Sequence, residues 1–236
     1  MLDGKVALIP GGAGNVGEGL VRSFLRQGAT VITTSRQPEK LDKLRGYLGD
    51  LATDRFVPLV GDLADFPSAE KLRDQILDKF QHLDVIVASL GGTWKGNLPL
   101  TQVSMADWQK FITSNLTSHF VCAQTFLPLL KQTKSSSYTF LGGSAAENVV
   151  PFYSLVGIPA AGQLMMAKIV IAEMQDSPIR INEVVINSLV NTRETKEQAQ
   201  PEWITADEIG DYVAWLASDE AYMVRASVLH LQQQPR

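Results

Sequence analysis

The stretch "KVALIPGGAGNVGEGLVRSFLRQG", residues 5–28, determines how the rest of the chain is interpreted. It begins with an apolar run, continues through a loop rich in glycine and ends in a segment whose apolar residues recur with a helical period. Glycine lets a backbone approach a ligand closely, and a helix N-terminus presents free N–H groups and a positive dipole end. The stretch therefore predicts a strand, a tight turn and a helix that bind the phosphates of a dinucleotide.

The glycines of this loop are spaced three residues apart, at Gly11, Gly14 and Gly17, with Asn15 and Val16 between the last two. We expect these five residues to surround the pyrophosphate of a bound nucleotide, because the loop follows a strand and opens a helix. A tight turn that binds no ligand is the alternative.

The remainder of the chain alternates short apolar runs with longer helical patterns, which is typical of βαβ units and a parallel sheet. Runs such as "VALI" and "DVIVA" are apolar throughout, as expected for strands covered on both faces. We predict a single α/β domain over residues 1–236, with a doubly wound (Rossmann) parallel sheet of about seven strands and helices on both faces. The predicted strands are 5–10, 30–35, 55–62, 83–89, 137–143, 179–187 and 227–231. The predicted helices are 15–27, 38–48, 67–80, 104–131, 157–175 and 206–217.

Composition excludes several classes of partner. The 236 residues are 45% hydrophobic and 19% charged with a net charge of −4, and no run of Lys or Arg suggests nucleic acid or an anionic membrane surface. The single cysteine, Cys122, cannot form an internal disulfide, which agrees with a reducing compartment. The N-terminus enters the first strand directly and no apolar run of about 18 residues stands out, so we expect a cytoplasmic protein without a membrane span.

The type of nucleotide is indicated by the end of the second predicted strand. An acidic residue there would accept hydrogen bonds from a ribose 2′-hydroxyl, but Ser35 and Arg36 occupy the position, and arginine suits a 2′-phosphate. The sequence therefore favours NADP(H), with NAD(H) as the alternative if Arg36 is only a solvated charge. After the third strand, Asp62 and Leu63 are expected beside the adenine, although an aspartate there is also a common helix cap.

With these residues in place, the sequence resembles the short-chain dehydrogenase/reductase family over essentially its whole length. The family loop Thr-Gly-x-x-x-Gly-x-Gly aligns with residues 10–17, where the middle glycine is replaced by Asn15, a residue that tolerates positive φ. The resemblance implies three further site residues. Asn115 matches the family's helix asparagine, Ser144 matches the serine that holds the substrate oxygen, and Thr192 would face the nicotinamide amide.

The same alignment exposes a departure from the family. The family's tyrosine lies thirteen residues beyond the serine and its lysine four residues further on, but these positions hold Gly157 and Ala161. No tyrosine of the chain is followed by a lysine four residues later. The family's Asn-Asn-Ala-Gly and Pro-Gly segments are replaced as well, by residues 88–91 and 186–187. The resemblance thus implies a site without the usual proton donor and its activating cation.

Substitutes for the missing pair are few. Tyr153 lies four residues before Gly157 and is either a displaced proton donor or a packing residue. Lys168 lies seven residues beyond Ala161, about 10 Å along a helix, which is too far to replace the lysine. His82, His119 and His230 are expected to be structural and away from the mouth of the site, and no cluster of metal ligands is present in the sequence.

Two functions remain open at this stage. One is an NADP(H)-dependent oxidoreductase with weak or non-standard hydride transfer to a small carbonyl-type substrate. The other is a catalytically inactive protein that senses NADP(H) or acts as a scaffold through a protein partner. In either case the family resemblance implies a homodimer or homotetramer assembled through the predicted helices 104–131 and 157–175.

Overall fold

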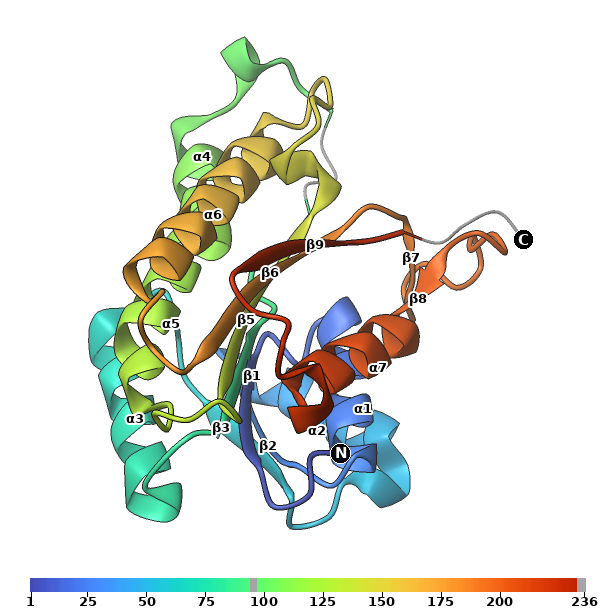
Figure 1. The fold of residues 1–236 in the computed structure, drawn as a ribbon. Helices are drawn as coiled ribbons and strands as arrows, with labels where there is room; N and C mark the ends of the chain where they lie inside the picture. The colour runs from blue at the N-terminus through green and yellow to red at the C-terminus, as the bar shows by residue number, and fades with distance from the viewer. Residues whose placement is uncertain (94–96, 233–236) are drawn as a thin grey trace.

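A computed structural model describes residues 1–93 and 97–232 of the 236-residue chain. Its centre is a seven-stranded parallel sheet in the order β3-β2-β1-β4-β5-β6-β9 (Figure 1). The strands are β1 (Val6–Pro10), β2 (Thr30–Ser35), β3 (Phe56–Val60), β4 (Val85–Ala88), β5 (Ser137–Gly143), β6 (Arg180–Ile186) and β9 (Ser227–Leu231). The order reverses between β1 and β4, and ligands of such sheets bind beside this point at the carboxyl ends of the strands.

Helices cover both faces of the sheet, as the alternating pattern predicts. Figure 1 shows α1, α2 and α7 on one side and α3, α4, α5 and α6 on the other. The helices are α1 (Asn15–Arg26), α2 (Pro38–Leu48), α3 (Phe66–Phe80), α4 (Met105–Ile112), α5 (Ser118–Phe126), α6 (Ser154–Glu173) and α7 (Ala206–Ala217). The doubly wound α/β fold is therefore confirmed. A short parallel pair, β7 (Val190–Asn191) with β8 (Ile204–Thr205), was not predicted.

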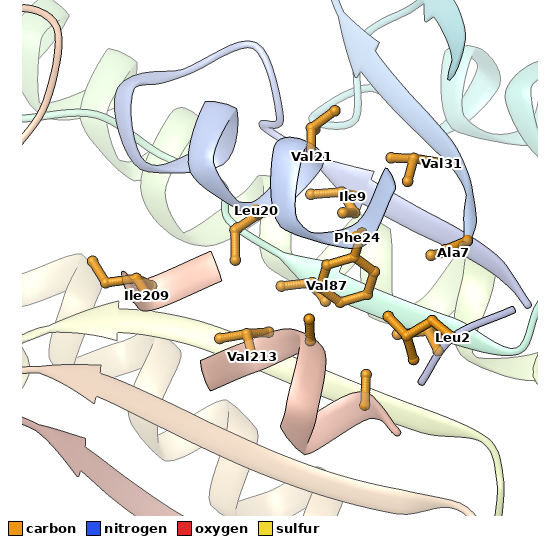
Figure 2. Packing of buried hydrophobic residues seen from close by; sticks show 14 of the residues in the cluster. Leu2, Ala7, Ile9, Leu20, Val21, Phe24, Val31, Val87, Ile209 and Val213 are labelled. Carbon is orange, nitrogen blue, oxygen red and sulfur yellow. The ribbon is translucent and has the colours of Figure 1, made fainter. Parts of the chain in front are cut away.

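The strands separate two hydrophobic cores because their alternate residues point to opposite faces. On β1, Ala7 and Ile9 join the core beneath α1 and α7, whereas Val6 and Leu8 join the core beneath α3, α5 and α6. Figure 2 shows the first core, in which Phe24 of α1 lies close to Val87 of β4. Burial on both faces explains why these strands are apolar throughout.

Two glycines let α1 and α7 pack in direct backbone contact. A Cβ on Gly19 would overlap the backbone carbonyl of Ala206, and a Cβ on Gly210 would lie about as close to the carbonyl of Gly19. This contact could not be predicted from the sequence. A glycine within a predicted helix indicates only a low helix propensity and says nothing about which helix packs against it. The contact fixes the start of α7 against α1.

Replacing Gly19 with alanine is expected to destabilise the protein by about 1–3 kcal/mol, because the added methyl group forces two helix backbones apart. Urea unfolding measures the change. Gly46→Ala is the matched control, since Gly46 also lies in a helix but a Cβ there meets no atom within 4 Å. The control should be neutral or more stable by about 0.5–1 kcal/mol. Equal effects of the two substitutions would contradict the close-contact interpretation.

Two predicted helices differ from the structure. The predicted helix 104–131 is divided, because α4 passes into a π-helical turn, Thr113–Thr117, before α5 begins. The predicted helix 157–175 is α6, which starts three residues earlier and ends at Glu173. By length and composition alone α6 could cross a membrane, a criterion that core helices of soluble proteins also meet.

Candidate functional site

The glycine-rich loop after β1 has a shape that side chains would prevent. Gly11 has φ of +79°, and a Cβ there would overlap the carbonyl oxygen of Ser89, the residue that follows β4. A Cβ on Gly17 would in turn overlap the carbonyl oxygen of Gly11. These two glycines therefore bring the loop, the end of β4 and the start of α1 into direct contact at the carboxyl edge of the sheet.

The N-terminus of α1 is left open toward this loop. Gly14 is the N-cap residue and has no side chain to cap the helix, while its own N–H donates to the carbonyl of Gly11 at 2.8 Å. No hydrogen bond joins the N–H groups of Asn15, Val16 or Gly17 to another of the described residues. Free N–H groups at a helix N-terminus bind anions, so this end of α1 fits the pyrophosphate of a dinucleotide.

Asn15 corrects one detail of the alignment with the family loop. Tolerance of positive φ was the proposed reason for an asparagine at this position. In the structure Asn15 is the first residue of α1, and the non-glycine residues with positive φ in the described part of the chain are Gln81, Phe152 and Ala226. The left-handed conformation is therefore not what selects asparagine here.

The ends of β2 and β3 bring together the residues expected at the adenosine end. The Arg36 guanidinium lies 3.8 Å from the Asp62 carboxylate, and both side chains are substantially exposed. Asp62 also accepts a hydrogen bond from the N–H of Ala64 at 2.9 Å, and Leu63 is buried beneath it. The Ser35 hydroxyl accepts from the N–H of Gln37 at 3.1 Å. Arg36 is thus an exposed cation, loosely paired with Asp62, at the edge where a nucleotide phosphate would lie.

Asn115 is the buried centre of the π-helical turn between α4 and α5. Its Oδ1 accepts from the N–H of Gly92 at 2.9 Å, and its Nδ2 donates to the carbonyl of Gly92 at the same distance. Gly91 has φ of +107°, and a Cβ there would lie 3.0 Å from Oδ1 of Asn115. The asparagine therefore fixes the loop after β4, and π-helical turns of this kind are frequent at functional sites.

Ser144 follows β5 in a 3₁₀ turn, Ser144–Ala146, that packs against the first turns of α6. A Cβ built on Gly157 would lie 3.4 Å from the carbonyl oxygen of Ala145, the next residue after Ser144. The structure thus places Gly157 beside the serine turn. Ala161, one turn further along α6, is exposed. Neither position carries a group that can transfer a proton.

Tyr153 is the N-cap residue of α6, and no hydrogen bond joins its phenol to Ser144 in the described structure. The phenol hydroxyl is hydrogen-bonded to the hydroxyl of Thr93, in the loop after β4. No hydrogen bond joins the Oγ of Ser144 to any residue in the described part of the chain. Thr93 was not anticipated from the sequence, where a threonine in a polar loop carries no distinguishing signal.

Thr192 begins the segment between β7 and β8 and turns its hydroxyl toward its own loop. Its Oγ1 lies 3.0 Å from Oγ1 of Thr195, which also accepts from the N–H of Thr192 at 2.8 Å. A groove of about 450 Å³ lies between this segment and the N-terminal turns of α1 and α7. The groove is lined by Asn15, Glu18, Gly19, Arg22, Asn191, Thr192, Arg193, Lys196, Thr205, Ala206 and Asp207.

The histidines behave differently from one another. His119 is buried, and its Nε2–H donates to the carbonyl of Leu90 at 3.2 Å. Burial lowers the pKa of His119 to about 4, so the ring stays neutral. His82 lies 3.4 Å from Asp84 at the opposite edge of the sheet. Nε2 of His230 lies 2.8 Å from the carboxylate of Glu147. Glu147 directly follows the serine turn.

A buried carboxyl group lies behind the serine turn on β6. Glu183 is fully buried, and its Oε2 accepts from Nε2 of Gln163 at 2.8 Å while its Oε1 has no hydrogen-bond partner in the described structure. A Cβ on Gly142 would lie 2.6 Å from that Oε1, so the glycine makes room for it. Burial raises the pKa of Glu183 to about 8, against the opposing effect of the Gln163 hydrogen bond. Glu183 is the charged residue of "INEVVIN", and a charge inside a buried strand is the sequence signal for this group.

No group of three or more histidine, cysteine, aspartate or glutamate side chains is arranged to hold a metal ion within residues 1–93 and 97–232. The candidate site consists of a glycine-rich loop, an open helix N-terminus and a serine turn. These parts belong to different strands and meet at one edge of the sheet.

Comparison with known proteins identifies the class. Residues 11–233 match the family described as Enoyl-(Acyl carrier protein) reductase. Serine 3-dehydrogenase of Agrobacterium fabrum is 25% identical over 92% of this chain and 89% of its own length. The 3-oxoacyl-[acyl-carrier-protein] reductase FabG of Thermotoga maritima is also 25% identical, over 97% of this chain and 96% of the relative. The chain therefore belongs to the short-chain dehydrogenase/reductase family of oxidoreductases, whose members generally bind NAD(P)(H).

Solved structures show the same fold. A short-chain type dehydrogenase/reductase from Mycobacterium ulcerans superposes with a TM-score of 0.87 at 19% identity, covering 98% of this chain and 89% of the other. An enoyl-[acyl-carrier-protein] reductase (NADH) from Aquifex aeolicus superposes with a TM-score of 0.82 at 24% identity, covering 98% and 96%. At these identities the likeness concerns the fold alone.

Proposed function

We propose that the protein is an NADP(H)-binding oxidoreductase in which hydride transfer to a small carbonyl compound is weak or follows a non-standard route. The observation that carries this proposal is the contrast between two parts of the site. The nucleotide side keeps its glycine loop and open helix N-terminus, whereas the catalytic side has Gly157 beside the serine turn and Ala161 one turn later.

Each part has a definite role in the proposal. The N–H groups at the start of α1 bind the pyrophosphate, Arg36 binds the 2′-phosphate, and Asp62 accepts from the adenine amino group. Bound NADPH would supply the hydride. The Ser144 hydroxyl donates a hydrogen bond to the substrate oxygen and so polarises the carbonyl. General acid catalysis contributes roughly 10²–10⁴ in rate, so a site limited to a serine hydrogen bond would be slow by about that factor.

Replacing Arg36 with leucine is expected to weaken NADPH binding by about 10- to 100-fold, because a charge-assisted hydrogen bond to the 2′-phosphate is lost. NADH has no 2′-phosphate, so its dissociation constant should stay within about twofold. Fluorescence titration of both nucleotides against wild type and variant measures the difference. If the substitution weakens the binding of NADPH and NADH equally, or changes neither dissociation constant, Arg36 does not select NADP(H).

A second function has its own support. The two residues that the family uses for proton transfer are replaced by Gly157 and Ala161, which have no ionisable group. The segment after β6 also has Asn187 where the family has glycine. These changes favour a protein that binds NADP(H) as a signal and acts through a partner. Tight NADPH binding with no oxidation of NADPH across a panel of ketones, aldehydes and quinones would support this function over the first.

We further propose that a second copy of the chain covers the outer face of α6. Ile158, Met165 and Ile169 are 43%, 55% and 50% exposed on this face, and α4 packs beside it. An apolar helix face of this size is costly in water unless another surface covers it.

Placing a charge on this face should separate the subunits. Met165→Glu with Ile169→Glu is expected to convert the wild-type oligomer to a monomer in light scattering coupled to size exclusion. Glu173→Lys, at the exposed end of the same helix, is the control and should leave the oligomer intact. A wild-type protein that is already monomeric at micromolar concentration would contradict the proposal.

A further inference from the structure

The phenol of Tyr153 is held by a contact that family resemblance does not account for. Its hydroxyl is hydrogen-bonded to Thr93, which links the residue before α6 to the loop after β4. These two segments belong to neighbouring strands, β5 and β4, and both lie at the carboxyl edge of the sheet. The contact therefore joins the loop that follows β4 to the loop that follows β5 and carries the serine turn.

The loop that carries Thr93 is itself held in place by hydrogen bonds from Asn115. Asn115 binds both the N–H and the carbonyl of Gly92, the residue before Thr93, at 2.9 Å in each case. Ser114 donates a further hydrogen bond to Oδ1 of Asn115 at 2.9 Å, and the Asn115 side chain is buried. A backbone segment bound at both of its polar groups cannot rotate without breaking them, so the position of Thr93 follows from Asn115.

No other tyrosine of the chain can take this place. Tyr138 is fully buried, and its hydroxyl donates a hydrogen bond to the sulfur of Cys122. Tyr212 packs against Trp215 on α7. Tyr47 lies on α2 beneath Arg193, and Tyr222 lies beyond α7. Tyr153 is thus the phenol that the fold delivers to the edge where the loops after β4 and β5 meet.

We propose that Asn115, Gly92 and Thr93 form a chain of contacts that holds the Tyr153 phenol as the proton donor of this site. Thr93 is a positioning residue in this arrangement, and Tyr153 takes the role that Gly157 has lost. The inference rests on the proposed oxidoreductase function. In the reaction, the carbonyl carbon receives a hydride from NADPH, which becomes NADP⁺, and the carbonyl oxygen receives the phenolic proton. The resulting phenolate regains a proton from water.

The test combines three variants with three measurements. The variants are Tyr153→Phe, Thr93→Val and Thr93→Ser, the last of which keeps the hydroxyl. The measurements are NADPH binding by fluorescence, kcat and KM for reduction of 2,3-butanedione, and the ¹³C NMR signal of the tyrosine Cζ atoms, which is assigned by its loss in Tyr153→Phe. The NMR signal reports the hydrogen bond of the phenol and does not depend on turnover.

If the inference holds, Tyr153→Phe lowers kcat by about 10²-fold or more, because the acid is removed. Thr93→Val lowers kcat by about 10- to 100-fold, because the donor is misplaced, and it shifts the Tyr153 signal. Thr93→Ser restores both values to near wild type. The NADPH dissociation constant should stay within about twofold in all three variants, which separates positioning from folding.

Three results would overturn the inference. A wild-type protein that reduces 2,3-butanedione equally well after Tyr153→Phe uses another proton source, although the oxidoreductase function stands. A wild-type protein that binds NADPH without any turnover has no working donor, and the nucleotide-sensing function gains support. An unchanged Tyr153 signal in Thr93→Val would show that Thr93 does not hold the phenol. Failure to bind NADPH at all would instead remove the proposed function on which the inference rests.

Discussion

Introducing Gly157→Tyr together with Ala161→Lys is expected to raise kcat/KM for reduction of a simple ketone by about 10²-fold or more. The two substitutions restore a phenol beside the serine turn and a cation one helical turn away. A neighbouring cation favours the ionised form of a phenol and so brings its proton-transfer strength closer to neutral pH. The cation also offers a hydrogen-bond donor at the edge where the nicotinamide ribose is expected.

Both positions accept the first atoms of the new side chains. At Gly157 the first new carbon meets the Ala145 carbonyl at 3.4 Å, an ordinary van der Waals separation, and Ala161 is exposed. Ser144 is already in place on the adjoining turn. The expected gain therefore comes from placing a phenol and a cation directly beside the serine turn, where Gly157 and Ala161 now supply neither group.

The matched control is Gly157→Phe with Ala161→Lys, which adds the same ring and the same cation without the hydroxyl. Steady-state oxidation of NADPH at saturating concentration, followed by absorbance, measures all three proteins. The phenylalanine control should remain near wild type. A tyrosine–lysine protein that folds, binds NADPH and is no faster than this control would show that the site is limited by something other than proton delivery.

Glu183→Gln is expected to leave the free energy of unfolding nearly unchanged at pH 5 and to raise it by up to about 4 kcal/mol near pH 8.5. The carboxyl group is fully buried on β6, and burial raises its pKa from 4.5 to about 8. Each unit of pKa shift corresponds to about 1.4 kcal/mol of difference between the folded and unfolded states.

The sign follows from which form the folded state prefers. Because the pKa in the folded protein is above that in the unfolded chain, the folded state holds the proton more tightly. The stability that this protonated group contributes is fully present below about pH 4.5 and is lost progressively as pH rises to about 8. Glutamine has the shape of the protonated glutamate and is neutral at every pH. The free energy of unfolding of the variant therefore does not fall as pH rises through the pKa of Glu183.

Urea unfolding between pH 5 and pH 8.5 measures the free energy of unfolding of wild type and variant. The contributions of other titrating groups cancel in the difference between the two proteins. Glu220→Gln is the control, since Glu220 is exposed after α7. Its stability difference from wild type should stay constant across the range to within about 0.5 kcal/mol. A Glu183→Gln curve parallel to that of wild type would mean that Glu183 is not held in its neutral form.

The fold was predictable because its signals are local and repeated. Apolar runs such as residues 5–10 and 83–89 mark strands buried on both faces, and the helical patterns between them specify right-handed crossovers. The parallel order and the position of the glycine loop then follow. The π-helical turn at Thr113–Thr117 was not predictable, because it arises where the Asn115 side chain leaves the helix to bind the loop after β4.

The site was predictable only in part, because most of its contacts join residues distant in sequence. The structure brings Arg36 next to Asp62 and Gly157 next to the serine turn, in agreement with their expected neighbourhood. The hydrogen bond between Tyr153 and Thr93 joins residues 60 positions apart in the sequence. The hydrogen bond between Glu183 and Gln163 depends on how α6 packs over β6. Neither contact leaves a periodic mark in the sequence.

The most direct test of the account is a titration of the wild-type protein with NADPH, followed by nucleotide fluorescence. The account predicts saturable binding of one NADPH per chain, abolished by Gly11→Val, in which the added side chain would collide with the carbonyl of Ser89. Absence of saturable binding, or equal binding by Gly11→Val, would contradict the claim that this loop is a working nucleotide site.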